Sequence, residues 1–124
     1  MNPADLFSNE PNPLHLAPGE VLFKAGDPGD VMFVVLEGSL DIMVDNRLVE
    51  KSIRGDIIGE MALIDESPRS GTVAASEAST LAKLDTARFQ RLIQLNPFFA
   101  THVMKVLVNR IRRSDHERLK KASV

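Results

Sequence analysis

The chain has 124 residues, of which 44% are hydrophobic, and a formal net charge of −2 at pH 7, so it can form one globular domain with a modest core. It contains no cysteine, which excludes disulfides, thiolate zinc sites, cysteine-bound iron–sulfur clusters and cysteine nucleophiles. No apolar run approaches the ~20 residues of a membrane span, and the N-terminus lacks the features of a secretory signal, so we expect a soluble cytoplasmic protein with no membrane partner.

The first predicted element is a brief helix that begins after Asn2. Asn is a suitable N-cap because its side-chain oxygen can accept a hydrogen bond from a free amide of the first turn. Pro3 then stands at the first helical position, where the missing N–H does no harm. Three further prolines, Pro11, Pro13 and Pro18, follow this helix, so we expect extended pieces of chain there.

From Leu14 to Leu84 the pattern is that of short strands separated by turns. The strand-like runs are 20–24, 31–37, 39–44, 48–53, 71–75 and 80–85. Residues 31–36 are all apolar, which is typical of a strand buried on both sides, whereas residues 39–44 alternate loosely and should have one face in water. A tight turn is expected at residues 45–47, because Asn46 tolerates positive φ. All seven glycines fall between residues 19 and 71, at or beside proposed turns, which favours a small barrel or roll.

Residues 55–73 carry the chemistry of the chain. Glu60 and Arg69 lie nine residues apart on a segment that reads as a turn, a short helical turn over residues 60–63 and a loop. The planar fork of Arg suits a phosphate, and an ionised carboxylate, which only accepts hydrogen bonds, suits a ribose hydroxyl. Gly59 lets the backbone come close, and the free amides of the helical turn would point at an anion. The segment therefore predicts a site for a small ligand with both a phosphate and a hydroxyl.

The same segment resembles the phosphate-binding cassette of cyclic-nucleotide-binding domains. Residues 59–63 read Gly-Glu-Met-Ala-Leu and residues 68–72 read Pro-Arg-Ser-Gly-Thr, and the step from Glu to Arg resembles that of the kinase-regulatory and channel members. Gly71 departs from the Ala that the family usually carries, and a glycine should loosen the loop entropically. Residues 22–38 look like the glycine-rich opening of the family's β-roll, and the whole resemblance covers residues 14–112.

The resemblance implies a fold and a ligand. The fold is mainly β with flanking helices: a β-roll of the double-stranded β-helix or jelly-roll type over about residues 14–85, a short N-terminal helix, and C-terminal helices over about 87–95 and 97–119, in a single domain of residues 1–124. The ligand is cAMP or cGMP, with Ser70 compatible with either base, and no cofactor is implied. The residues implied to bind the ligand are Gly59, Glu60, Met61, Ala62, Arg69, Ser70 and Thr72.

After Asp85 the period of apolar residues becomes helical. Thr86 is the predicted cap of a helix whose apolar residues follow at i, i+3 and i+4, and Asn96 should end it because the residue before a proline disfavours the α region. Pro97 then opens a second helix. The apolar residues expected on one side of that helix are Ala100, Val103, Met104, Leu107 and Ile111.

The charges of the chain are distributed unevenly. Residues 86–124 hold nine Lys or Arg and two acids, whereas the preceding residues hold six basic and fifteen acidic side chains. The basic C-terminal helix either docks on the acidic body or meets an anionic partner, such as an effector protein. A side chain from this helix can also lie over a purine, where a guanidinium could stack on the base. The candidates for that contact are Arg110, Arg112, Arg113 and His116.

Catalysis and metal binding are not expected. The three histidines, His15, His102 and His116, show no ligand spacing, so neither a metal nor a haem is predicted. No Ser/His/Asp grouping suggests a triad, and no pair of carboxylates has the context of acid–base catalysis. We therefore do not expect an enzyme.

We interpret the chain as a sensor that binds cAMP or cGMP reversibly and signals by moving its C-terminal helices, the second of which would swing over the base. Two alternatives stay open. The chain is the sensory fragment of a DNA-binding regulator resembling the catabolite activator group, or it is a degenerate roll that binds no nucleotide and serves as an interaction module. We expect a monomer or weak dimer, and no nucleic acid as a partner of this chain alone.

Overall fold

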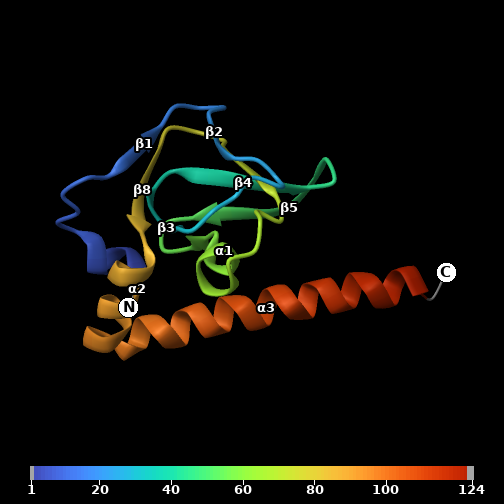
Figure 1. The fold of residues 1–124 in the computed structure, drawn as a ribbon. Coiled ribbons are helices and arrows are strands. Elements are labelled where there is room, and N and C mark those ends of the chain that lie inside the picture. Colours follow the sequence, from blue (N-terminus) through green and yellow to red (C-terminus); the bar gives the residue numbers. More distant parts are fainter. Residues whose placement is uncertain (1, 123–124) are drawn as a thin grey trace.

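The computed structural model describes the backbone of residues 2–122 and the side chains of residues 2–113. The strands are β1 (Leu14–Leu16), β2 (Val21–Phe23), β3 (Met32–Glu37), β4 (Ser39–Val44), β5 (Arg47–Ile53), β6 (Ile57–Ile58), β7 (Thr72–Ala75) and β8 (Ser79–Leu84). The helices are the short 3-10 helix η1 (Pro3–Phe7), α1 (Glu60–Asp65), α2 (Thr86–Leu95) and α3 (Pro97–Ala122). Two antiparallel sheets, in the orders β1-β8-β3-β6 and β2-β7-β4-β5, form the body, and the helices lie along one side of it (Figure 1). The predicted class, mainly β with flanking helices, is confirmed.

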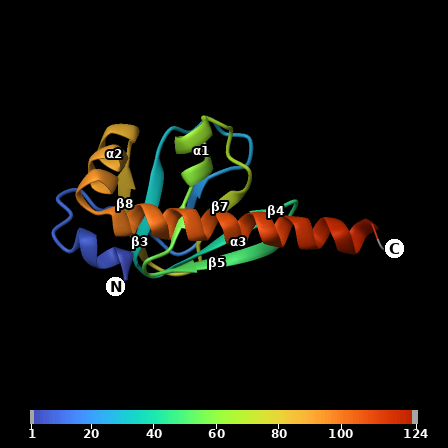
Figure 2. The same cartoon turned by 90° about the horizontal axis from the view of Figure 1, so that it is seen from below.

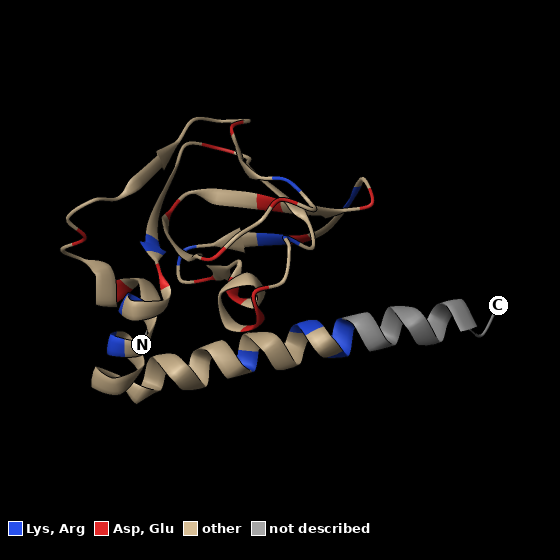
Figure 3. Ribbon diagram, viewed as in Figure 1, with Lys and Arg blue, Asp and Glu red and all other residues tan. Residues whose placement is uncertain are grey.

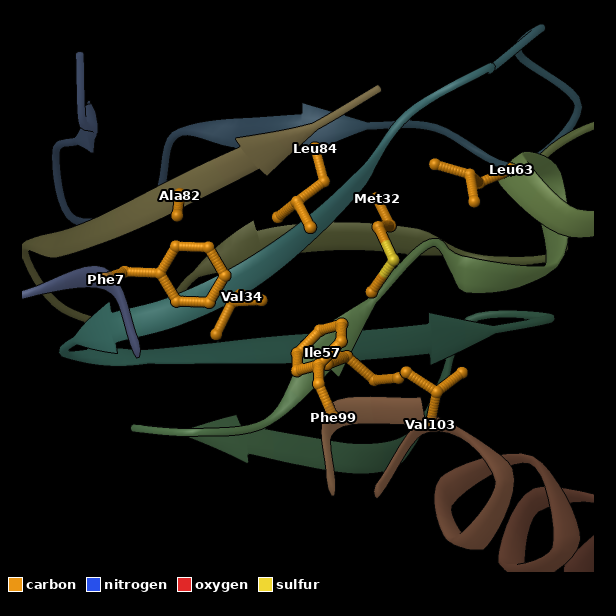
Figure 4. Packing of buried hydrophobic residues seen from close by; sticks show 9 residues of the cluster. All are labelled: Phe7, Met32, Val34, Ile57, Leu63, Ala82, Leu84, Phe99 and Val103. Carbon is orange, nitrogen blue, oxygen red and sulfur yellow. The ribbon is translucent and has the colours of Figure 1, made fainter. Parts of the chain in front are cut away.

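Strand β3 explains why one run of the sequence is continuously apolar. Successive side chains of a strand point to opposite faces, and both faces of β3 are covered. Met32 and Val34 pack into a cluster between β3 and the helices, and Figure 4 shows them there together with Phe99 of α3. Phe33 and Val35 pack into a second cluster between the two sheets. The prediction of a strand buried on both sides is therefore confirmed, and β3 is the wall that the two clusters share.

The predicted turn and caps can be compared directly with the backbone. Asn2 caps η1 as predicted, because its Oδ1 accepts a hydrogen bond of 2.9 Å from the Ala4 amide. Asp45 and Asn46 have φ of 53° and 62°, as expected for the tight turn between β4 and β5. The prediction that Thr86 caps α2 is wrong. Asp85 is the cap, since its Oδ1 accepts a hydrogen bond of 2.8 Å from the Arg88 amide and Thr86 is already helical.

Helix α3 docks along a stripe that only partly matches the predicted one, since Val103 and Leu107 lie on the docked side as predicted. Phe99 and Val103 are buried in the cluster beneath β3, and Val106 and Leu107 pack partly against it. The prediction that Met104 and Ile111 share the docked side is wrong, since both are more than half exposed. The docked stripe continues through the polar Arg110 instead, which belongs to the site described below. Figure 2 shows α3 running along the body from α2 past β5.

Candidate functional site

A cavity of about 300 Å³ opens between α1, β4, β5, the loop before β7 and helix α3. This volume lies at the small end of ligand pockets, which run from roughly 300 to 1,000 Å³. Most of the lining is apolar, and four charged side chains enter it from different elements: Glu50 of β5, Glu60 of α1, Arg69, and Arg110 of α3. Arg113 completes the set at the α3 side. Segments far apart in the sequence thus contribute charges to one concave site.

Arg69 lies in a channel that two glycines keep open. A Cβ at Gly29 or at Gly59 would collide with its guanidinium, and Gly59 has the positive φ of 81° that favours glycine. The ring of Phe23 lies under the guanidinium, 4.2 Å from the Arg69 Cζ atom to the ring centroid. Gly59 is therefore needed both for the turn into α1 and for the passage of the Arg69 side chain.

The guanidinium of Arg69 is buried and under-satisfied. Only 7% of the residue is exposed, and among the described residues its guanidinium makes one hydrogen bond, from Nη1 to the Gly59 carbonyl at 3.3 Å. The Nε donor is buried and has no partner among the described residues. Burial lowers the pKa of Arg69, while the charges of Asp30, Asp27 and Glu60 oppose this, and an arginine remains a cation at neutral pH. A buried cation with a free donor is the arrangement that an anion satisfies.

Glu60 offers the complementary group in the same cavity. The residue is 1% exposed, and its carboxylate pairs through Oε1 with Nη1 of Arg110. Its Oε2 is buried and accepts no hydrogen bond from any described residue. A buried carboxylate oxygen without a donor favours binding of a hydroxyl or an N–H. Glu60 and Arg69, which carry these two unpaired atoms, both line the same cavity.

Arg110 links α3 to the cavity through three acceptors. Arg110 donates hydrogen bonds to Glu50 from Nε at 3.2 Å and from Nη2 at 2.7 Å. Nη2 also donates to the Ile57 carbonyl at 2.9 Å, and Nη1 donates to Glu60. Burial by itself would lower the pKa of Arg110, but the hydrogen bonds and charges of both carboxylates raise it above its ordinary value. Figure 3 shows basic residues on the part of α3 that passes beneath the acidic α1. Of the two interpretations of the basic helix, docking on the acidic body is the one that these contacts bear out.

Glu50 also binds the next turn of α3. Arg113 places Nη1 3.0 Å from Oε1 of Glu50 and donates from the same nitrogen to the Val49 carbonyl at 3.1 Å. Burial by itself would raise the pKa of Glu50, but the hydrogen bonds and charges of Arg110 and Arg113 lower it below 4.5. Two arginines from successive turns of one helix thus meet on one carboxylate of β5.

The pairing of Glu50 with the two arginines predicts that the fold loses stability at acidic pH. A carboxyl whose pKa is lower in the folded chain than in the unfolded chain stabilises the fold fully at a pH above its ordinary pKa of 4.5. This contribution disappears as the pH falls through the pKa that the group has in the folded chain. We expect the free energy of urea unfolding of the parent to fall on acidification below about pH 4.5 more steeply than that of Glu50→Gln. Parallel slopes for the two proteins would show that Glu50 gains nothing from its arginines.

The structure gathers most of the predicted site residues. Those that line the cavity are Gly59, Glu60, Met61, Ala62, Arg69 and Ser70, and from α3 Arg110 and Arg113. Thr72 is not among the lining residues, since its Oγ1 accepts a hydrogen bond of 3.0 Å from the Ala25 amide and ties β7 to the end of β2. Arg112 is exposed and lies outside the lining. The side chain of His116 lies outside the described residues.

Two residues have roles that the sequence pattern did not indicate. Glu50 lies outside the segment of residues 55–73, and no local motif marks it. Gly71 was expected to loosen the loop, but it instead permits a close approach to β4. A Cβ there would lie 2.8 Å from the Met43 carbonyl oxygen and 3.2 Å from a methyl group of Val44. Glycine at this position therefore lets the loop after Arg69 pack directly on β4.

None of the helices in the described part of the chain combines the length and apolarity that a membrane span requires. No cluster of three or more His, Cys, Asp or Glu among the described residues could hold a metal ion.

Comparison with known proteins adds an independent line of evidence. The family model described as cyclic nucleotide-binding domain matches residues 13–96. A cyclic nucleotide-gated potassium channel of Mesorhizobium japonicum is 41% identical over 92 residues, which are 74% of this chain and 25% of the channel. The chain thus spans about a quarter or less of the length of the curated relatives it matches.

Solved structures of similar fold include the catabolite activator protein of Thermus thermophilus, with a TM-score of 0.76 and 26% identity. The similarity covers 90% of this chain and 60% of that protein. The cAMP-bound PfPKA-R has a TM-score of 0.65 and 27% identity, with 81% of this chain and 36% of that chain covered. The similarity therefore extends from sequence to three-dimensional structure.

Proposed function

Because the chain belongs to the cyclic nucleotide-binding domain family, we propose that it binds a cyclic nucleotide, cAMP or cGMP, reversibly and as a regulatory module. The proposal treats residues 1–124 as a single domain of this kind. It assigns no catalytic step to the chain, since the groups in the cavity bind and orient a ligand.

One observation carries the proposal. Nε of Arg69 and Oε2 of Glu60 are both buried without a partner, and both residues line one cavity. A cyclic nucleotide presents an anionic phosphate and one free ribose hydroxyl, at the 2′ position, so it supplies what each group lacks. The phosphate would meet Arg69 and the amides near Gly59, and the hydroxyl would donate to Glu60.

Helix α3 supplies the third contact in this proposal. Arg110 and Arg113 line the same cavity as Arg69 and belong to α3, so a base held beside them would lie against this helix. A bound ligand can change the position of α3 only by its difference in affinity for two arrangements of the helix. The proposed signal is therefore a change in the packing of α3, which an effector protein would read from the basic helix.

Calorimetric titration with cAMP and, separately, with cGMP tests the binding step. The chain has no Trp or Tyr, so intrinsic fluorescence is a poor probe. Micromolar or tighter binding of either nucleotide is expected and would name the ligand. The absence of heat with both, in a protein shown to be folded, would favour the degenerate interaction module instead.

The absence of cysteine allows a clean test of the α3 signal. A single Cys at the exposed Lys105 carries a fluorescent label, and a single Cys at the exposed Glu37 on β3 serves as the control. Saturating nucleotide should change the emission of the α3 label and leave the β3 label unchanged. Equal responses at both positions would refute a movement specific to α3.

The channel around Arg69 gives a further prediction. In Gly29→Ala the new methyl group would displace the flexible Arg69 guanidinium, because its Cβ would collide with Nε. We expect nucleotide affinity to fall about tenfold or more, equivalent to roughly 1.4 kcal/mol, with little change in the free energy of unfolding. Titration and urea unfolding of the same sample measure both quantities. Unchanged affinity would mean that the position of Arg69 is not critical.

A second candidate function follows from the similarity to the catabolite activator protein. This chain covers 60% of that protein, which is compatible with a sensory fragment of a DNA-binding regulator. A concentration-dependent dimer with affinity for duplex DNA would favour this candidate, and a monomer without such affinity would favour the free-standing sensor.

A further inference from the structure

Glu50 lies at the centre of the polar network although it stands outside the segment that holds Glu60 and Arg69. Its two oxygens accept hydrogen bonds from Nε and Nη2 of Arg110. Glu50 also pairs with Arg113 and accepts a hydrogen bond from the hydroxyl of Ser52. Its side chain is 18% exposed, so these contacts are shielded from water. This two-pronged contact is the geometry in which a guanidinium binds a carboxylate most strongly.

The orientation of Arg110 decides how much of Glu60 remains available. With Nε and Nη2 directed at Glu50, only Nη1 reaches Glu60, and it pairs with Oε1. Oε2 of Glu60 is left without a donor. If Arg110 were free to turn, its fork would take both oxygens of Glu60, because the paired geometry is preferred and both side chains are largely buried.

We propose that Glu50 is a positioning residue of the ligand site, which holds Arg110 so that one oxygen of Glu60 stays free for the ribose 2′-hydroxyl. This inference rests on the proposed function, and it adds a residue and a mechanism of specificity. Glu50 acts through Arg110 and does not itself contact the ribose. Since Glu50 also binds Arg113, the same carboxylate holds α3 against β5. The position of α3 and the hydrogen bonding of the ribose therefore both depend on Glu50.

The experiment compares cAMP with 2′-deoxy-cAMP in calorimetric titrations of the parent and of Glu50→Gln. A hydrogen bond to a charged group is worth about 10- to 100-fold in affinity, so the parent should prefer cAMP by about that factor. In Glu50→Gln the amide no longer competes with Glu60 for the fork, and the preference should fall to less than about threefold. A general loosening of the fold would weaken both nucleotides by the same factor and leave their ratio unchanged.

Asp41→Asn is the matched control. Asp41 pairs with Lys51 at 2.7 Å on the same β4–β5 hairpin, but this pair lies on the surface and outside the cavity lining. The control should keep the parental ratio. Glu50→Asp keeps the charge but is one methylene too short to hold both nitrogens of Arg110, so its ratio should lie between those of the parent and Glu50→Gln. This variant also decides the matter if Glu50→Gln does not fold.

The outcomes separate this inference from the proposed function. A parent that binds neither cAMP nor cGMP refutes both, and a parent that binds only cGMP is compared with 2′-deoxy-cGMP in the same way. A parent that binds cAMP but does not discriminate against 2′-deoxy-cAMP, or a parental ratio in both Glu50 variants, overturns the role of Glu50 and leaves nucleotide binding intact.

Discussion

Replacing Arg69 with alanine should remove most of the nucleotide affinity of this chain while leaving the fold intact. Truncating one partner of a buried, hydrogen-bonded charge pair typically weakens binding by about 2–5 kcal/mol, which is roughly 30- to 5,000-fold. Arg69 is the only basic side chain among the described residues that enters the cavity from the side of residues 68–71. No neighbouring cation on that side can take over the phosphate.

The stability of Arg69→Ala should not fall with its nucleotide affinity. Arg69 makes no ion pair with the described carboxylates, and the hydrogen bond of 3.3 Å from its guanidinium to the Gly59 carbonyl is weak. The charges of Asp30, Asp27 and Glu60 offset only part of the cost of burying the guanidinium, so its removal should leave the free energy of unfolding unchanged or raise it. The expected signature is lost binding in a protein at least as stable as the parent.

Calorimetry and urea unfolding of Arg69→Ala, with Arg69→Lys beside it, check both parts. Lysine keeps the charge but lacks the fork, so it should bind with an intermediate affinity. If Arg69→Ala bound nucleotide as tightly as the parent, the phosphate would lie elsewhere and the assignment of the site would be wrong. If the variant lost affinity only in proportion to a lower stability, Arg69 would be a structural residue.

The part of the site that could be predicted from sequence is the part that is local in the chain. Gly59, Glu60 and Arg69 fall within a short segment, and their chemistry and spacing follow from a turn, one short helix and a loop. The strand pattern was equally accessible, because Met32–Val35 must alternate between two buried faces. The two-residue strand β6 could not be predicted, because so short a run shows no periodicity of apolar residues.

The part that could not be predicted depends on contacts between distant residues. Glu50 and Arg110 are 60 residues apart, and their contact requires the register of β5 and the docking angle of α3 to be known together. The channel of Arg69 likewise needs Gly29, which lies 40 residues before it. The docked stripe of α3 was misplaced because its apolar residues are spread over more than one face, so periodicity alone did not distinguish Met104 from Val106.

Cap positions illustrate a finer limit. Asp85 and Thr86 are adjacent, and both residue types are good N-caps. Propensity therefore predicts that a helix begins here but does not choose between them. The end of β8 at Leu84 decides, because it leaves Asp85 in extended backbone with φ of −84° and ψ of 177°. Helix boundaries of this kind follow from the strand that precedes them.

Replacing Arg110 with alanine should have the largest effect on stability. Removing one partner of a buried ion pair destabilises a fold by about 3–5 kcal/mol, because the remaining charge is left buried. Here the remaining charge is Glu60, whose side chain is 2% exposed, and Glu50 would lose its main partner as well. Equilibrium urea unfolding followed by circular dichroism measures the change, with Arg112→Ala as the control. Arg112 lies two residues after Arg110 and is exposed, so its loss should change stability by less than about 0.5 kcal/mol.

A second substitution identifies the buried carboxylate as the cause. In the parent, Glu60→Gln should destabilise the fold, because it breaks the pair with Arg110. In the Arg110→Ala background the same change removes an uncompensated buried charge, so it should stabilise the fold. This reversal of sign corresponds to a coupling energy between the two sites, which for residues in one network is about 0.5–3 kcal/mol. If Glu60→Gln were destabilising by the same amount in both backgrounds, Arg110 and Glu60 would be energetically independent. In that case the docking of α3 would rest on Phe99, Val103 and the apolar residues around them and on the contacts of Arg110 and Arg113 with Glu50, and it would not depend on Glu60.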